Sequence, residues 1–302
     1  MTEADPSPEA ISALRNQAGF QVAIGSAARS FVALYRGNRL LNSLMNDRAR
    51  ALFTHVALYL HYQGMPGGRP GLTVGAMKDI CVQLRLCSPG RCEAVLALMR
   101  SAGFFGSAPN ADRRRRVLIP TGKLMALHRQ RWGANFEAMR LVMPAAERYC
   151  AALSDDRFVR AFVGSLVEKF IAGLRVLDYA PELEMFAERN AGMVILFSLA
   201  LAGPGQGPIA PPMAVPLSIN ALATMFSVSR KHVLTMLRDA EAQQLLVRGG
   251  QGNDEITILP RGRDALETMF ATMFLYLAQC AEDGLRASGE ARTPQQTMSC
   301  AV

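Results

Sequence analysis

The sequence lacks the residue patterns that mark most enzymes and metalloproteins. It contains no G-x-S-x-G, Walker, H-E-x-x-H or G-x-G-x-x-G motif in its required context. Its histidines form no i, i+4 pair and have no carboxylate cluster beside them: His55, His61, His128 and His232. We therefore expect no enzymatic activity, no metal and no cofactor.

Cysteine is sparse and is not arranged in pairs. Six cysteines are spread over 302 residues, with no C-x-x-C motif and no histidine at zinc-finger spacing. Reduced cytosolic thiols are the simplest interpretation. Cys81 and Cys92 continue apolar helix faces and are expected in the core. Cys87, near Arg85 and Arg91, has electropositive surroundings and is the candidate for a redox-sensitive thiol.

Long apolar runs are missing as well. The most apolar stretch, MVILFSLALA at residues 193–202, is about half the length needed to cross a bilayer. It predicts a buried helix. The first residues, MTEADPSPEA, lack the basic and apolar regions of a signal peptide. We therefore expect a cytoplasmic protein that does not insert into a membrane.

Positive charge exceeds negative charge. The chain has 33 Lys and Arg against 25 Asp and Glu, a net charge of +8, and this excess favours polyanionic partners. Half of the residues (50%) are apolar, and 302 residues are enough for two domains with real cores.

The chain also repeats itself. When Ser88 is aligned with Ser229, the apolar positions of CSPGRCEAVLALMRSAGFF coincide with those of VSRKHVLTMLRDAEAQQLL. The same register aligns RARALFTHVALYL with RNAGMVILFSLAL, a pair of long helices. With one residue of slippage, VLIPTGKLMAL matches ITILPRGRDAL, and Gly122 falls on Gly262. Matches in the same order and at nearly constant spacing predict a tandem duplication.

This duplication predicts the domain organisation. We expect a tail with a short helix at residues 1–18, a first module at 19–145, a second module at 146–285 and a disordered tail at 286–302. The expected fold class is mainly α with small β-hairpins, the two modules being joined by long helices.

Each module is expected to contain a winged helix-turn-helix. In the second module, Ser218 and Ser229 are N-cap candidates for two short helices across a tight turn. The second helix has an apolar stripe at spacings of three and four, formed by Val233, Met236, Leu237 and Ala240. LLVRGGQGNDEITILP then predicts a hairpin. The first module repeats this order, with Ser88 as the cap, a turn one residue longer and FFGSAPNADRRRRVLIP as the hairpin.

This order of elements, followed by a long helix, resembles the MarR family of bacterial regulators, and ADRRRRVLIPTGK at residues 111–123 is similar to that family's wing and next helix. The resemblance implies a DNA-binding transcriptional regulator. Family members are usually homodimers with one copy per chain, so the resemblance implies a pseudo-dimeric monomer, or a homodimer of such chains. A small-molecule effector of unidentified chemistry stays open as a second partner. The Met-rich face with Met269 and Met273 fits either an effector pocket or an ordinary core.

In such a motif the second helix enters the major groove and the wing reaches the minor groove. In the second module we expect contacts to double-stranded DNA from Ser229, Arg230, Lys231, His232, Thr235 and Arg238. In the first module we expect them from Ser88, Gly90 and Arg91, and from the hairpin tip with Arg113, Arg114, Arg115 and Arg116. The second wing, GGQGNDE, lacks arginine. The halves therefore differ, and the DNA site is expected to depart from a perfect palindrome.

Two other functions fit the same pattern. Plasmid-type replication initiators also carry two winged helices in one chain. Winged helices further serve as bridging modules in protein-interaction scaffolds. The arginine run at residues 113–116 argues against the scaffold.

Overall fold

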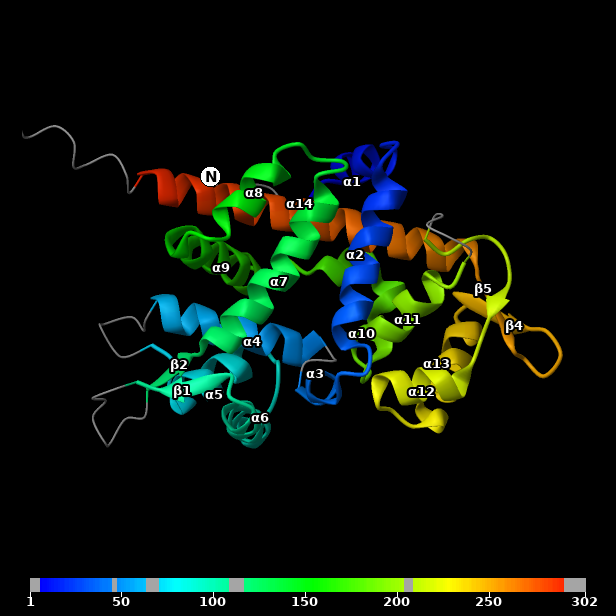
Figure 1. Cartoon of the computed structure of the whole chain (residues 1–302), viewed down its shortest axis with the longest axis horizontal. Helices are drawn as coiled ribbons and strands as arrows, with labels where there is room; N and C mark the ends of the chain where they lie inside the picture. Colours follow the sequence, from blue (N-terminus) through cyan, green and yellow to red (C-terminus); the bar gives the residue numbers. More distant parts are fainter. Residues whose placement is uncertain (1–5, 45–47, 64–70, 109–116, 204–208, 291–302) are drawn as a thin grey trace, which may run out of the picture.

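The computed structural model describes residues 6–44, 48–63, 71–108, 117–203 and 209–290 (Figure 1). Within these ranges the chain is mainly helical, with 14 α-helices and two small antiparallel sheets. The expected class, mainly α with small β-hairpins, is confirmed at this level. The arginine run at residues 113–116 lies outside the described residues, so its contact with DNA stays a prediction.

The first part of the chain contains seven helices and a hairpin. Strand β1 pairs with β2 in antiparallel register, with Phe105 opposite Pro120, and Thr73 forms a bridge to Val117. In chain order the elements are α1 (Pro8–Arg15), α2 (Phe20–Tyr35), α3 (Arg39–Leu44), α4 (Arg48–Gln63), α5 (Val74–Gln83), α6 (Pro89–Ser101), β1 (Phe105–Ser107), β2 (Leu118–Pro120) and α7 (Gly122–Met139).

The second part contains the remaining helices and a sheet with strand order β3-β5-β4. Its elements are α8 (Ala146–Ala152), α9 (Asp156–Ile171), the 3-10 helices η1 (Val176–Tyr179) and η2 (Pro181–Leu183), α10 (Glu184–Ala187), α11 (Gly192–Ala200), β3 (Val215–Pro216), α12 (Ile219–Phe226), α13 (Arg230–Ala242), β4 (Leu246–Gly249), β5 (Glu255–Ile258) and α14 (Pro260–Glu290). Strand β3 was not predicted, because two residues are too short to show a sequence pattern.

Two element boundaries correct the sequence prediction. Helix α14 continues to Glu290, so the tail expected to be disordered from residue 286 is helical at its beginning. Helix α11 begins at Gly192 and not at Arg189, because Ala191 adopts a left-handed backbone conformation with φ 58°. Gly192 itself lies against the backbone, since a Cβ there would be 2.0 Å from the Phe186 carbonyl oxygen. The expectation that MVILFSLALA forms a buried helix is confirmed.

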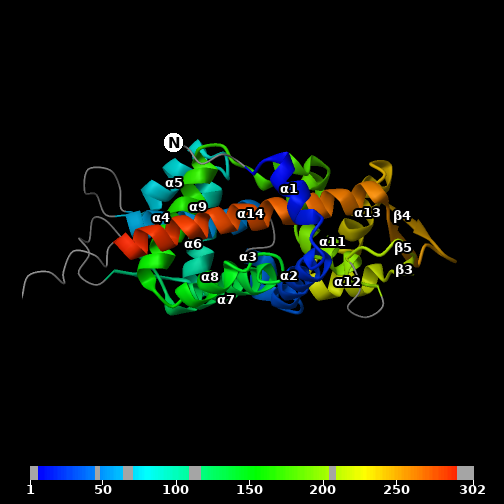
Figure 2. The ribbon, with the colours of Figure 1, turned by 90° about the horizontal axis from the view of Figure 1, so that it is seen from above.

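Helix α14 is the longest element and organises the packing. It runs along most of the length of the molecule (Figures 1 and 2). It packs against α9, α1, α8 and both 3-10 helices, while α2 packs against α7 and α11. The buried apolar side chains of both parts form one continuous core. None of the helices in the described ranges has the length and apolarity of a membrane-spanning segment.

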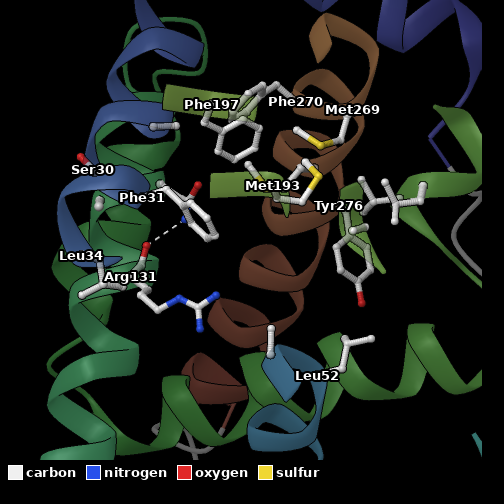
Figure 3. A pocket seen from close by; sticks show the side chains of 18 of the residues that line it. Ser30, Phe31, Leu34, Leu52, Arg131, Met193, Phe197, Met269, Phe270 and Tyr276 are labelled. Carbon is white, nitrogen blue, oxygen red and sulfur yellow. Dashed lines mark hydrogen bonds between the residues drawn. The ribbon is translucent and has the colours of Figure 1, made fainter. Parts of the chain in front are cut away.

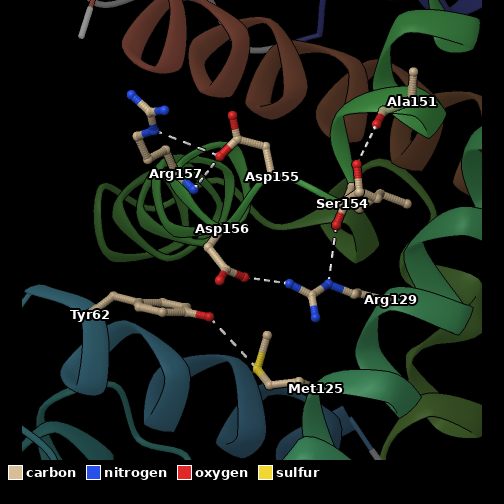
Figure 4. A network of polar contacts seen from close by, with 9 residues as sticks. Tyr62, Met125, Arg129, Ala151, Ser154, Asp155, Asp156 and Arg157 are labelled. Carbon is tan, nitrogen blue, oxygen red and sulfur yellow. Dashed lines mark hydrogen bonds and ion pairs between the residues drawn. The ribbon is translucent and has the colours of Figure 1, made fainter. Parts of the chain in front are cut away.

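A polar network also joins the two parts (Figure 4). Arg129 on α7 donates from Nη2 to Asp156 Oδ1 at 2.5 Å and from Nε to the Leu153 carbonyl oxygen at 3.1 Å. Asp155 caps the same end of α9 by accepting from the backbone N–H of Arg157 at 2.8 Å. The long helix of the first part is thereby attached to the first turn of α9.

Candidate nucleic-acid interface

Helices α12 and α13 are joined by a tight turn, and a serine caps the N-terminus of each helix. Ser218 Oγ accepts from the Ala221 N–H at 3.2 Å, and Ser229 Oγ accepts from the His232 N–H at 3.0 Å. Both predicted N-caps are confirmed. Between them, Ser227 adopts φ 57° and the Val228 N–H bonds the Ala223 carbonyl oxygen at 3.0 Å, which closes the end of α12.

The apolar stripe of α13 faces the core. Val233, Met236, Leu237 and Ala240 are all buried, as their spacing predicts. The opposite face therefore points to solvent. It exposes four of the residues predicted to contact DNA, namely Arg230, Lys231, Thr235 and Arg238.

The carboxylates of α13 are neutralised by arginines from neighbouring elements. Asp239 Oδ2 lies 2.6 Å from Arg189 Nη2, and Arg189 is close to the start of α11. Glu241 accepts from Arg248 Nε at 2.8 Å and from its backbone N–H at 2.8 Å. Burial raises the pKa of Glu241, but the hydrogen bonds from Arg248 outweigh burial and leave this pKa below its ordinary value. Because Arg248 is engaged in this way, strand β4 offers no unpaired guanidinium.

The cations of α13 are in the opposite situation. In the part of the chain that the structure describes, no hydrogen bond or ion pair engages the guanidinium of Arg230 or Arg238 or the ammonium of Lys231. The exposed face of α13 thus carries cationic groups that form no ion pair in the described residues, although the charge of Arg238 also acts on Glu241 one turn later. Such a face is suited to phosphate oxygens and to acceptors on base edges.

His232 has an intramolecular partner that the sequence does not indicate, and its contact with DNA stays a prediction. It is half-buried, and its Nε2 lies 2.9 Å from the Asn190 carbonyl oxygen. Its imidazole therefore joins α13 to the segment before α11. Ser229 is exposed, but its hydroxyl is used as the helix cap.

The first part contains the same turn with one extra residue. Arg85 adopts φ 53°, and the Leu86 N–H bonds the Cys81 carbonyl oxygen at 2.9 Å, as at the end of α12. Ser88 then caps α6 by accepting from the Arg91 N–H at 3.3 Å. The inserted residue is Cys87, and the longer turn agrees with the prediction.

Helix α6 has a weaker polar surface than α13. Ser88, Gly90 and Arg91 are exposed, as expected. Glu93 lies on the same side and forms an ion pair with Lys78 at 2.6 Å. The other exposed positions include Ala94, Ala97 and Leu98, which cannot donate hydrogen bonds from their side chains. The difference between the two helices follows the sequence prediction.

The surroundings of Cys87 at this turn do not activate its thiol. Cys81 and Cys92 are buried, as expected, and Cys87 is half-buried. Burial raises the pKa of Cys87, and this effect exceeds that of Arg91. A raised pKa lowers the thiolate fraction at neutral pH, so the surroundings of Cys87 disfavour the proposed redox role.

The elements that carry the predicted contacts lie on one side of the molecule. In Figure 1, α6 and the α12–α13 pair both lie below α14, and the two hairpins point toward opposite ends of the long axis.

Comparison with models of known families, with curated proteins and with solved structures gave no match for this chain. Sequence reasoning missed Arg189 and Asn190, because nothing in the local pattern indicates their contacts with α13.

Proposed function

We propose that this protein is a DNA-binding transcriptional regulator with two non-identical winged helix-turn-helix modules in one chain. The order α5, α6, β1, β2, α7 matches the order α12, α13, β4, β5, α14, which supports a duplication. The observation that carries the proposal is the exposed positive face of α13, formed by Arg230, Lys231 and Arg238.

The charge arrangement of α13 explains this choice. Its two acidic residues in the last turns, Asp239 and Glu241, are paired with arginines of other elements. Arg230, Lys231 and Arg238 keep their charge on the exposed face. Arginine and lysine bind phosphates and release the counter-ions condensed on DNA, which favours binding entropically. Thr235 between them has a hydroxyl and a methyl group, both of which can contact base edges.

The two modules make different contributions in this proposal. The second module reads the major groove with α13, while its wing has no unpaired arginine. The first module has a helix with few donors and contributes the predicted arginine wing at residues 113–116. A DNA-binding regulator is favoured over a protein-interaction scaffold. The reason is that the cations of α13 and of the predicted wing occupy the positions that contact DNA in winged helices.

A salt-series titration on random duplex DNA tests the proposal. The wild type is compared with Arg230→Ala/Lys231→Ala, which removes two charges from α13. The matched control, Arg140→Ala/Arg148→Ala, removes two partly exposed charges from α7–α8, near α14 (Figure 1). We expect the slope of log K against log salt to become shallower by about 2 in the α13 variant only.

Two results would overturn the proposal. One is the absence of DNA binding by the wild type at low salt. The other is an equal change of slope in the α13 variant and the control, which would indicate a nonspecific charge effect. A third variant, with Arg113 to Arg116 changed to alanine, tests the predicted wing of the first module in the same titration. Far-UV circular dichroism of each variant verifies that the helices are intact.

A further inference from the structure

A cavity of about 690 Å³ lies between the two parts of the chain (Figure 3). Helices α2, α7, α9, α11 and α14 contribute to its wall. This volume falls within the range of pockets that hold small organic ligands. Most of the wall is apolar and includes Phe31, Leu34, Met193, Phe197, Met269 and Phe270.

One charged side chain points into this apolar space. Arg131 extends from α7, and Figure 3 shows its guanidinium directed toward the centre of the cavity. Its Nη1 is buried and has no hydrogen-bond partner among the described residues. The other cation in the wall, Arg175, donates to the Leu174 carbonyl oxygen at 3.0 Å and lies 3.4 Å from the centroid of the Phe170 ring.

The wall provides no carboxylate to balance Arg131. None of the described residues that line the cavity is Asp or Glu. Asn135 is uncharged, and its Nδ2 donates to the backbone carbonyl oxygen of Arg131 at 2.8 Å. Arginine keeps its charge in protein interiors, and a buried charge without a partner is unfavourable. A ligand that brings one negative charge would satisfy the guanidinium.

We infer that this cavity binds an amphipathic monocarboxylate. Its carboxylate accepts from Arg131, and its apolar body packs against Phe31, Met193 and Met269. A planar guanidinium matches the geometry of a carboxylate, and flexible methionines adapt to apolar groups of different shape. This site is separate from the positive face of α13 and does not depend on the proposed DNA binding.

Isothermal titration calorimetry with octanoate and its neutral analogue octanamide tests the inference on the full chain without DNA. We expect the wild type to bind octanoate at least tenfold more tightly than octanamide. Arg131→Met keeps an unbranched apolar stem and removes the guanidinium charge, so it should lose at least tenfold in octanoate affinity while octanamide affinity stays unchanged. Arg157→Ala, an exposed arginine on α9, is the matched control and should behave like the wild type.

A second measurement separates loss of binding from loss of folding. Without ligand, Arg131→Met should unfold at the same Tm as the wild type or at a higher one, because a guanidinium whose buried Nη1 has no hydrogen-bond partner among the described residues has been removed. Octanoate should raise the Tm of the wild type and not that of the variant. Met193→Trp, which fills the cavity, should reduce binding of both probes. Equal affinity of the wild type for the two probes, binding of neither, or unchanged octanoate binding by Arg131→Met would each overturn the inference.

Discussion

Arg189 and Asp239 form an ion pair, with Nη2 2.6 Å from Oδ2, that attaches the segment before α11 to the last turn of α13. A second contact lies beside it, where His232 Nε2 is 2.9 Å from the Asn190 carbonyl oxygen. A few residues later, Met193 and Phe197 of α11 line the cavity. One short segment thus contacts both the proposed DNA-reading helix and the proposed ligand site.

This ion pair predicts a small, measurable coupling. Both side chains stay partly exposed, at 30% and 44%, so solvent screens their attraction. In a double-mutant cycle with Arg189→Ala and Asp239→Ala, we expect a coupling of about 0.5–1 kcal/mol in the free energy of unfolding. Urea denaturation of the wild type, both single variants and the double variant gives this value. Fully additive single effects would show that the pair does not form in solution.

The difference between α6 and α13 predicts an asymmetric DNA site. Two identical reading helices would select an inverted repeat, because protein symmetry produces operator symmetry. Here α13 exposes Arg230, Lys231 and Arg238, whereas the aligned face of α6 exposes alanines. We expect selection from a random duplex library to yield one strongly specified half and one weakly specified half. Equal specification of both halves, or a symmetric footprint, would contradict this.

Substitution by alanine is expected to have a large effect at one of two aligned glycines and a small effect at the other. A Cβ at Gly262, in the first turn of α14, would lie 2.4 Å from the Leu245 carbonyl oxygen, whereas a Cβ at Gly122 on α7 would meet no atom within 4 Å. We expect Gly262→Ala to lower the free energy of unfolding by about 1–3 kcal/mol, because α14 must move away from the turn after α13. Gly122→Ala should change it by less than about 0.5 kcal/mol. Chemical denaturation measures both, and equal effects would contradict the close approach at Gly262.

A pair of histidines between α4 and α7 predicts sensitivity to acid. The rings of His55 and His128 lie 4.7 Å apart between centroids, and neither ring nitrogen of the buried His128 has a hydrogen-bond partner among the described residues. Burial, with a smaller contribution from Arg131, lowers the pKa of His55 to about 4. Burial, with His55 and Arg131, lowers the pKa of His128 well below its ordinary value. Both rings are therefore neutral at pH 7.

The direction of the pH dependence follows from the lowered pKa values of His55 and His128. Between pH 6.5 and pH 4 the unfolded chain takes up protons on these histidines and the folded chain does not, so stability falls as the pH falls. Each histidine that stays neutral in the folded state should remove about 1.4 kcal/mol per pH unit in this range. Unfolding free energies at pH 7, 6 and 5 measure the loss, and His128→Leu should make it less steep. Identical pH dependence in the wild type and this variant would contradict the assignment.

Features that depend on neighbours in the chain could be predicted from the sequence. The caps Ser88, Ser218 and Ser229 form hydrogen bonds within three residues of themselves. The apolar stripe of α13 is a local periodicity, and the extra residue before Ser88 is visible in the alignment of the repeats. These signals gave the mainly helical class, the two hairpins and the exposed face of α13.

Features that join distant segments were decided only by the tertiary structure. The contact of Arg189 with Asp239, the turning of His232 toward Asn190 and the pairing of β3 with β5 depend on packing between elements far apart in the chain. The cavity around Arg131 requires helices from both parts of the chain to meet. The sequence by itself determined the helix pairs of the two modules, their serine caps and the apolar face of α13, because these depend on interactions over a few residues. The packing of the helices decides which polar side chains stay exposed to solvent and which form hydrogen bonds or ion pairs.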